Sequence, residues 1–250
     1  MSHISRRRFL KTTSGALAAT AGLSVHAARV NTAQVVPGRV SPNERLNIAA
    51  IGVGGMGQAN IRACSSENIV ALCDVDDERA AGTYKEFPKA SRYRDFRVML
   101  DKEHQNVDAV IVATPDHTHA VAAMAVMRAG KHLYCQKPLA HSIYEVRKLT
   151  ETARQTGLQT QMGNQGHSSE EIRRLREWVR AGVLGKVREV YAWSDRPVGG
   201  DPWSDFPVMA RPKERPPVPE TLDWNLWLGP ANERPYHPVY CPTTWRGFWD

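Results

Sequence analysis

The sequence lacks any long apolar run, and its few cysteines are not arranged as metal ligands. No stretch approaches the roughly 20 consecutive apolar residues of a membrane-spanning helix, so we expect no stable membrane span. The four cysteines form no C-x-x-C pair and have no histidine at zinc-site spacing; they are Cys64, Cys73, Cys135 and Cys241. We therefore expect no metal site and four buried free thiols, although an oxidising compartment would permit a disulfide.

Acidic side chains are absent from the first 27 residues, and this absence explains much of the formal net charge of +7. Arg6, Arg7, Arg8 and Lys11 supply four of these charges, which leaves an excess of three for the rest of the chain. The remaining charges are mixed in sign with no long basic run, so we expect no nucleic-acid partner.

The same N-terminal stretch resembles a twin-arginine export signal. "SRRRFLK" follows the S-R-R-x-F-L-K pattern, and a weakly apolar segment leads to a V-H-A cleavage candidate at Ala27. We expect a signal segment at 1–28, a linker at 29–45, export by the twin-arginine machinery and a periplasmic or exported location. The alternative is a basic tail with no targeting role.

From Leu46 onward, short apolar runs alternate with helical patterns. This alternation predicts an α/β fold, with a doubly wound parallel Rossmann sheet over 46–165. Strands are expected at 46–52, 68–75, 107–114, 132–135 and 158–163, and helices at 56–64, 78–87, 119–130 and 143–157. Asp95 is placed to cap a further helix, and Gly130 to end one in a left-handed conformation.

Composition changes beyond this region. "GKVREVYAWS" (185–194) predicts a strand that opens a second, α+β open-sheet domain over 166–250. Residues 197–250 then hold eleven of the sixteen prolines and five of the seven tryptophans, which favours loops and packed aromatic corners over regular strands. We expect this domain to be incomplete, as in a truncated gene or a fragment.

A glycine cluster stands where the first strand meets the first helix. Gly52, Gly54 and Gly57 fit G-x-G-x-x-G, and Asp74 ends the next strand 22 residues after Gly52. The loop amides, including those of Gly55 and Met56, and the helix N-terminus suit a pyrophosphate. Asp74 would accept hydrogen bonds from the ribose diol and repel a 2′-phosphate, so NAD is expected as cofactor rather than NADP. The alternative is a structural turn.

Three more stretches carry a family resemblance: "ATPDHTHA" at 113–120, "KHLYCQKPLAHS" at 131–142 and "TQMGNQGHS" at 160–168. With the glycine cluster, they resemble the Gfo/Idh/MocA oxidoreductases, and "RPYHPVY" with the twin-arginine start resembles the secreted branch. The resemblance implies a Rossmann domain, a mostly antiparallel sheet domain, and hydride transfer between nicotinamide and a carbinol carbon of a sugar, polyol or derivative. Family members often pair through the sheet, so a homo-oligomer is an open expectation.

The resemblance also suggests which residues form the site. Lys137 stands in the family's Glu-Lys-Pro motif and is expected to act on the reacting hydroxyl, while Gln136 replaces the glutamate and loses its charge. His119 and His167 are the other catalytic candidates. Thr114, Pro115 and His117 are expected to contact the cofactor, as are Gln136 and Lys137; substrate candidates are Asn164, Gln165, Asp195, Arg196, Tyr236 and His237.

Three functions compete at this stage. The first is an exported NAD-dependent sugar or polyol oxidoreductase. The second is an NAD-retaining glycoside hydrolase, which oxidises its sugar transiently, eliminates the aglycone, adds water and reduces again. The third is a non-catalytic protein that binds NAD or sugar, favoured by Gln136 and by the expected incomplete second domain.

Overall fold

The structure is a computed structural model that describes residues 45–193, 210–242 and 244–248. All of these belong to the second of two units into which the chain divides, residues 32–250. The expected signal segment and two substrate candidates, Asp195 and Arg196, lie outside the described residues. Among the described helices, none has the length and apolarity to cross a bilayer.

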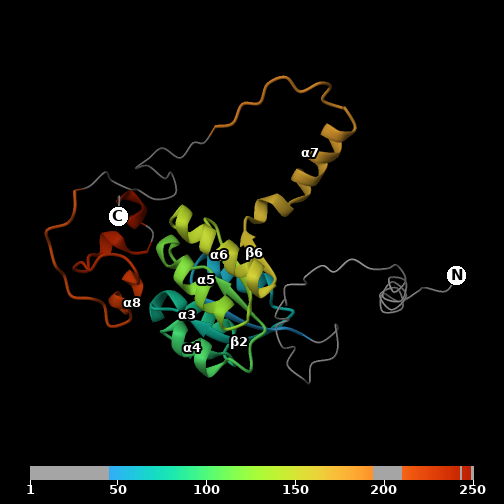
Figure 1. The fold of residues 1–250 in the computed structure, drawn as a ribbon. Coiled ribbons are helices and arrows are strands. Elements are labelled where there is room, and N and C mark those ends of the chain that lie inside the picture. The colour runs from blue at the N-terminus through green and yellow to red at the C-terminus, as the bar shows by residue number, and fades with distance from the viewer. Residues whose placement is uncertain (1–44, 194–209, 243, 249–250) are drawn as a thin grey trace, which may run out of the picture. The chain divides into compact units, whose positions relative to one another are not determined.

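Six parallel strands form one sheet in the order β3-β2-β1-β4-β5-β6 (Figure 1). This order is that of a doubly wound dinucleotide-binding sheet, and it confirms the predicted fold class. The strands are β1 (Asn47–Ile51), β2 (Asn68–Cys73), β3 (Ser91–Tyr93), β4 (Ala109–Val112), β5 (His132–Gln136) and β6 (Thr160–Gly163). The sequence patterns missed β3, which has only three residues and no buried position.

Helices cover both faces of the sheet, and the alternation along β1 explains why. Ala49 and Ile51 join a buried cluster beneath α4, α5 and α6, whereas Ile48 and Ala50 join another beneath α2 and α3. The helices are α2 (Met56–Ala63), α3 (Asp77–Glu86), α4 (Phe96–Lys102), α5 (His119–Arg128) and α6 (Ile143–Thr156). Burial on both faces is what gives these strands their continuous apolar runs.

Polar side chains and glycines set where the helices begin and end. The Asp95 side chain accepts a hydrogen bond from the Arg97 N–H at 2.9 Å and caps α4, as predicted. Ser142 and Glu145 form a reciprocal capping box at the start of α6. Gly130, just beyond α5, has a φ of +70°, the left-handed conformation expected there.

The four cysteines are free, as predicted: Cys73 and Cys135 are buried, and Cys64 and Cys241 are half-buried. Burial also raises the pKa of the Cys135 thiol to about 12, which makes it unreactive.

The predicted strand at 185–194 is wrong for the part that the structure describes. Residues 186–193 adopt no strand and are exposed throughout. A strand needs a hydrogen-bonded neighbour, and the described residues of the C-terminal half offer none. The β pairing described for this half is a single isolated bridge between Leu222 and Asp76.

The C-terminal half contains short helices joined by irregular backbone. These are η2 (Gln165–Ser168), α7 (Glu170–Arg180), α8 (Trp224–Leu228), η3 (Pro238–Tyr240) and η4 (Thr244–Gly247). Residues 221–223 lie against the carboxyl end of β2, where the Asp77 N–H donates to the Thr221 carbonyl at 3.0 Å and the Asp223 N–H to Val75 at 2.8 Å. The proline- and tryptophan-rich stretch thus reaches the edge of the sheet where parallel strands place ligands.

Candidate functional site

A cleft of about 490 Å³ lies over the carboxyl ends of β1, β2, β4 and β5. Because β1 pairs with β2 on one side and β4 on the other, the cleft stands at the point where the strand order reverses. Predicted site residues that line it are Gly52, Gly54, Met56, Asp74, Thr114, Pro115, His119, Gln136 and Lys137. Four strands distant in sequence therefore bring these groups together.

The glycine loop leaves no room for side chains at two positions. A Cβ on Gly57 would lie 1.8 Å from the Gly52 carbonyl oxygen, so any larger residue would separate α2 from β1. A Cβ on Gly52 would lie 2.7 Å from the Ala113 carbonyl oxygen, and the φ of +78° there also favours glycine. The backbone therefore passes close to β4 and then turns into α2, as the tight-turn and close-packing roles require.

Asp74 binds the glycine loop. Its Oδ2 accepts hydrogen bonds from the N–H groups of Val53 (2.8 Å) and Gly54 (3.2 Å), and its Oδ1 accepts one from Asp76 at 3.1 Å. Burial raises the pKa of the carboxyl group, and the three N–H donors oppose that effect. The sequence pattern did not reveal this structural role. Contact of Asp74 with a ribose stays a prediction, and the carboxylate retains lone pairs for it.

Gln136 is held rigidly at the end of β5. The side chain is 4% exposed, and its Oε1 accepts a hydrogen bond from the Lys137 N–H at 3.1 Å. Gly163 makes room for it, since a Cβ there would lie 2.9 Å from the Gln136 Cδ. The Nε2 group is buried with no hydrogen-bond partner among the described residues. A buried donor of this kind is costly unless a ligand accepts its hydrogen bond.

Lys137 follows directly and lines the cleft, joined to Pro138 by a cis peptide bond. Its side chain is exposed, so the ammonium group is accessible to a ligand. Thr114, at the end of β4, adds a buried hydroxyl oxygen that has no partner in the described part of the chain. The cleft therefore contains an accessible amine and two buried polar groups that fit a polar ligand.

His119 lines the cleft and links the ends of two strands, while its predicted catalytic role stays a prediction. The side chain is 1% exposed, and both ring nitrogens face backbone carbonyl oxygens. Nδ1 lies 2.6 Å from the Pro138 oxygen and Nε2 lies 2.8 Å from the Thr114 oxygen. A neutral ring donates to one of these two oxygens, and which one depends on the tautomer. It ties the end of β4 to the residues that follow β5.

His117 also departs from its predicted contact with the cofactor. Its Nε2 lies 3.0 Å from the Trp227 carbonyl oxygen, and its ring contacts those of Trp227 and Trp245 at 5.3 and 5.6 Å. It lines a neighbouring cavity rather than the cleft. Burial, the dominant cause, lowers the pKa of His117 and favours the neutral ring.

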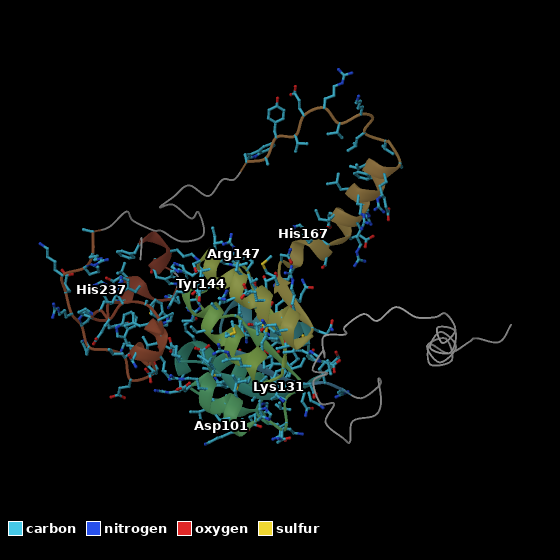
Figure 2. The ribbon with its side chains drawn as sticks, viewed as in Figure 1. Asp101, Lys131, Tyr144, Arg147, His167 and His237 are labelled. Atoms are coloured by element: carbon cyan, nitrogen blue, oxygen red, sulfur yellow. The ribbon has the colours of Figure 1, made fainter. Side chains whose placement is uncertain are left out.

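The predicted group after β6 is not brought to the cleft. The Gln165 Nε2 donates to Asn60 Oδ1 at 3.0 Å and lines a separate cavity on one face of the sheet. His167 is exposed on the segment between β6 and α7 (Figure 2), and Asn164 is half-buried without lining the cleft. The chain leaves β6 beside Gln136, since Gly163 pairs with Gln136, and then forms the short helix η2, so these three side chains do not line the cleft.

Tyr236 and His237 pack within the C-terminal segment. Tyr236 meets the Trp224 ring edge-on at 5.3 Å, and His237 Nδ1 accepts a hydrogen bond from the Val239 N–H at 3.1 Å, which caps η3 (Figure 2). Neither lines the cleft. Both side chains, which the sequence analysis lists as substrate candidates, therefore pack within this segment.

The cleft also contains side chains that sequence reasoning missed. Arg79 reaches the glycine loop, with its Nη2 3.4 Å from where a Gly55 Cβ would stand. Trp227, Trp245 and Arg246 come from the C-terminal segment, and an Arg246–Asp116 ion pair of 3.1 Å holds that segment to the loop after β4. The clustering of tryptophan beyond residue 197 was the available signal, but it does not show where those rings pack.

Comparison with known protein families agrees with the parallel sheet and the glycine loop described above. Residues 46–164 match the Gfo/Idh/MocA model described as an oxidoreductase family with an NAD-binding Rossmann fold. Residues 168–250 match the C-terminal alpha/beta domain of that oxidoreductase family. The chain belongs to the Gfo/Idh/MocA family. Its first domain is the family's NAD-binding Rossmann domain, so the cofactor prediction is confirmed.

The individual relatives include both dehydrogenases and glycosyl hydrolases. The chain is 44% identical over 100 residues to inositol 2-dehydrogenase 2 of Saccharopolyspora erythraea, covering 38% of this chain and 29% of that protein. It is 31% identical over 209 residues to glycosyl hydrolase family 109 protein 1 of Shewanella sp. (strain ANA-3). This match covers 75% of this chain and 45% of that protein. The crystal structure of myo-inositol 2-dehydrogenase from Lactobacillus plantarum superposes with a TM-score of 0.54 at 25% identity. The superposition covers 58% of this chain and 43% of that one. The chain thus spans about half the length, or less, of the curated relatives it matches.

Proposed function

We propose that this Gfo/Idh/MocA protein is an NAD-dependent oxidoreductase that acts on a hydroxyl group of a sugar, a polyol or a derivative. The observation that carries the proposal is the position of Lys137, which is exposed and lines the same cleft as the glycine loop and Asp74. Two groups that are buried without a hydrogen-bond partner in the described part of the chain, Thr114 Oγ1 and Gln136 Nε2, fit a polar ligand in that cleft.

The residues present divide the work between binding and chemistry. The amides of the glycine loop and the N-terminus of α2 would hold the pyrophosphate of NAD, and Asp74 would hold its ribose. When bound, NAD supplies a hydride acceptor. The Lys137 Nζ would hydrogen-bond the substrate hydroxyl and, as the free amine, take up its proton. His119 keeps the ends of β4 and β5 in register around this site.

NAD-retaining glycoside hydrolysis is the second candidate function. It is favoured by the 31% identity to glycosyl hydrolase family 109 proteins over 209 residues. Both functions require the cleft and Lys137. They differ in product, because oxidation accumulates NADH whereas NAD-retaining hydrolysis does not.

One experiment separates these functions. The protein is incubated with NAD and a panel of sugars, inositols and nitrophenyl glycosides, while NADH absorbance and nitrophenol release are followed together. Oxidation predicts NADH without nitrophenol, and hydrolysis predicts the reverse. Lys137→Met should abolish either activity and keep measurable NAD binding, because the glycine loop and Asp74 remain in place. Turnover that survives in Lys137→Met would contradict the proposed role of Lys137.

We also propose export by the twin-arginine route, on the strength of "SRRRFLK" and the acid-free stretch around it. Replacing Arg6 and Arg7 with lysine should retain the protein in the cytoplasm, and cell fractionation measures this directly. Self-association into a homo-oligomer is a further proposal from the family resemblance, and light scattering of the purified protein tests it.

A further inference from the structure

A second cavity, of about 330 Å³, adjoins the cofactor cleft and is walled by aromatic side chains. We call it the aromatic cavity; its rings are those of Trp227, Tyr240, Trp245 and Phe248. Trp227 and Trp245 line both this cavity and the cleft that contains Lys137. Its size lies within the range of small-molecule sites, and a ligand held in the cleft would border it directly.

The walls of the aromatic cavity are held in place by their own packing. The Trp227 ring stacks on Trp224 with centroids 4.8 Å apart and planes at 13°, and the Trp224 Nε1 donates to the Arg234 carbonyl at 2.8 Å. Tyr240 is 6% exposed and lies 5.0 Å from Phe248 between ring centroids. Rings fixed in this way lose little conformational freedom when a ligand binds.

Polar groups stand among these rings. Glu145, His141, Asn232 and Arg234 also line the aromatic cavity. Glu145 is anchored there, because its Oε2 accepts hydrogen bonds from the N–H groups of His141 (3.0 Å) and Ser142 (2.8 Å). The indole Nε1 of Trp245 is buried and has no acceptor among the described residues. An apolar ligand would leave that donor unsatisfied, whereas a hydroxyl oxygen would accept its hydrogen bond.

We propose that the aromatic cavity binds a second pyranose ring, one joined to the sugar or polyol whose hydroxyl meets Lys137. A pyranose presents C–H groups on its faces, which pack on aromatic rings, and hydroxyls around its edge, which suit the acidic, amide and basic groups of this cavity. The inference rests on the proposed function and deepens it, because it assigns the substrate class as glycosides rather than single sugars.

The test measures sugar binding to the full chain in the presence of NAD by calorimetry. The probes are cellobiose, maltose and lactose, each compared with glucose and galactose. We expect at least one disaccharide to bind about tenfold more tightly than its component monosaccharides, since the second ring adds aromatic contact. Trp227→Ala should abolish this preference. Trp178→Ala, which removes an exposed indole on α7 outside both cavities, is the matched control and should keep it.

Two further variants guard against misfolding. Trp227→Phe keeps an aromatic face and should retain part of the preference, and Trp245→Phe removes the indole donor with part of the ring and should reduce the preference for disaccharides over monosaccharides. Equal binding of mono- and disaccharides by a protein that binds NAD overturns this inference and leaves the proposed function intact. An unchanged preference in both Trp227→Ala and Trp245→Phe overturns it too. Failure of the protein to bind NAD would overturn both.

Discussion

At the scale of single residues, the cleft depends on positions where a side chain is either absent or fully engaged. Gly57 has no space for a Cβ, and Gly163 leaves the space that Gln136 fills. The amide of Gln136 keeps the acceptor that a glutamate would offer to the Lys137 N–H and adds a donor in place of a charge. Small differences in side-chain size and hydrogen bonding thus determine what the cleft can hold.

Gly57→Ala tests the glycine loop. The new Cβ would collide with the Gly52 carbonyl, so α2 must move away from β1. We expect the free energy of unfolding to fall by about 3 kcal/mol, at the upper end of the usual cost of overpacking, and NAD binding to be lost. Calorimetry and denaturant unfolding measure both effects. Gly166→Ala is the control, because nothing lies within 4 Å of its added Cβ; an equal loss of NAD binding there would contradict the argument.

At the scale of elements, the sequence predicted the buried strands and capped helices well because both have local signals. The strands β1, β2 and β4 are apolar runs buried on both faces, and Asp95 marks the start of α4 in the sequence itself. The errors fall on elements that depend on distant partners. The edge strand β3 is too short for a pattern, and residues 186–193 contain β-branched and aromatic residues typical of strands but have no described strand to pair with.

His119 links the residue after β4 to the residues that follow β5, and His119→Gln tests whether this link is structural or catalytic. Glutamine keeps an N–H donor but not the rigid ring that spans the two carbonyls, so we expect a stability loss of about 1–3 kcal/mol and reduced turnover, with the pH profile of activity unchanged. Thermal unfolding and initial rates across pH measure these effects. If His119 exchanged a proton with substrate, the variant would instead lose one limb of the pH profile and nearly all activity.

At the scale of the whole molecule, the C-terminal segment completes the carboxyl edge of the sheet. Trp227 contacts His117, and Arg246 pairs with Asp116, so a segment more than 100 residues away in the sequence borders the loop after β4. The segment supplies walls to the cleft and to the aromatic cavity. Substrate selection in this protein is therefore expected to depend on both halves of the chain.

The burial of His117 should make stability depend on pH. Burial lowers the His117 pKa, so the folded protein binds this proton less readily than the unfolded chain, where the value is near 6.5. The contribution is present above pH 6.5 and is lost as the pH falls through the lowered pKa. Denaturant unfolding between pH 7 and pH 5 should show declining stability, with a shallower decline in His117→Asn. Parallel slopes for the two proteins would contradict this assignment.

The sequence by itself determined the parallel sheet, the glycine loop and the family, because these follow from local periodicity and from residues that stand close together along the chain. The tertiary structure alone decided that His119 links two strand ends, that His117 lines the aromatic cavity, and that Gln165 hydrogen-bonds Asn60 outside the cleft. Each of these outcomes depends on which backbone carbonyl or ring a side chain meets after folding. These contacts join residues that are far apart in the sequence, so the spacing of residue types does not predict them.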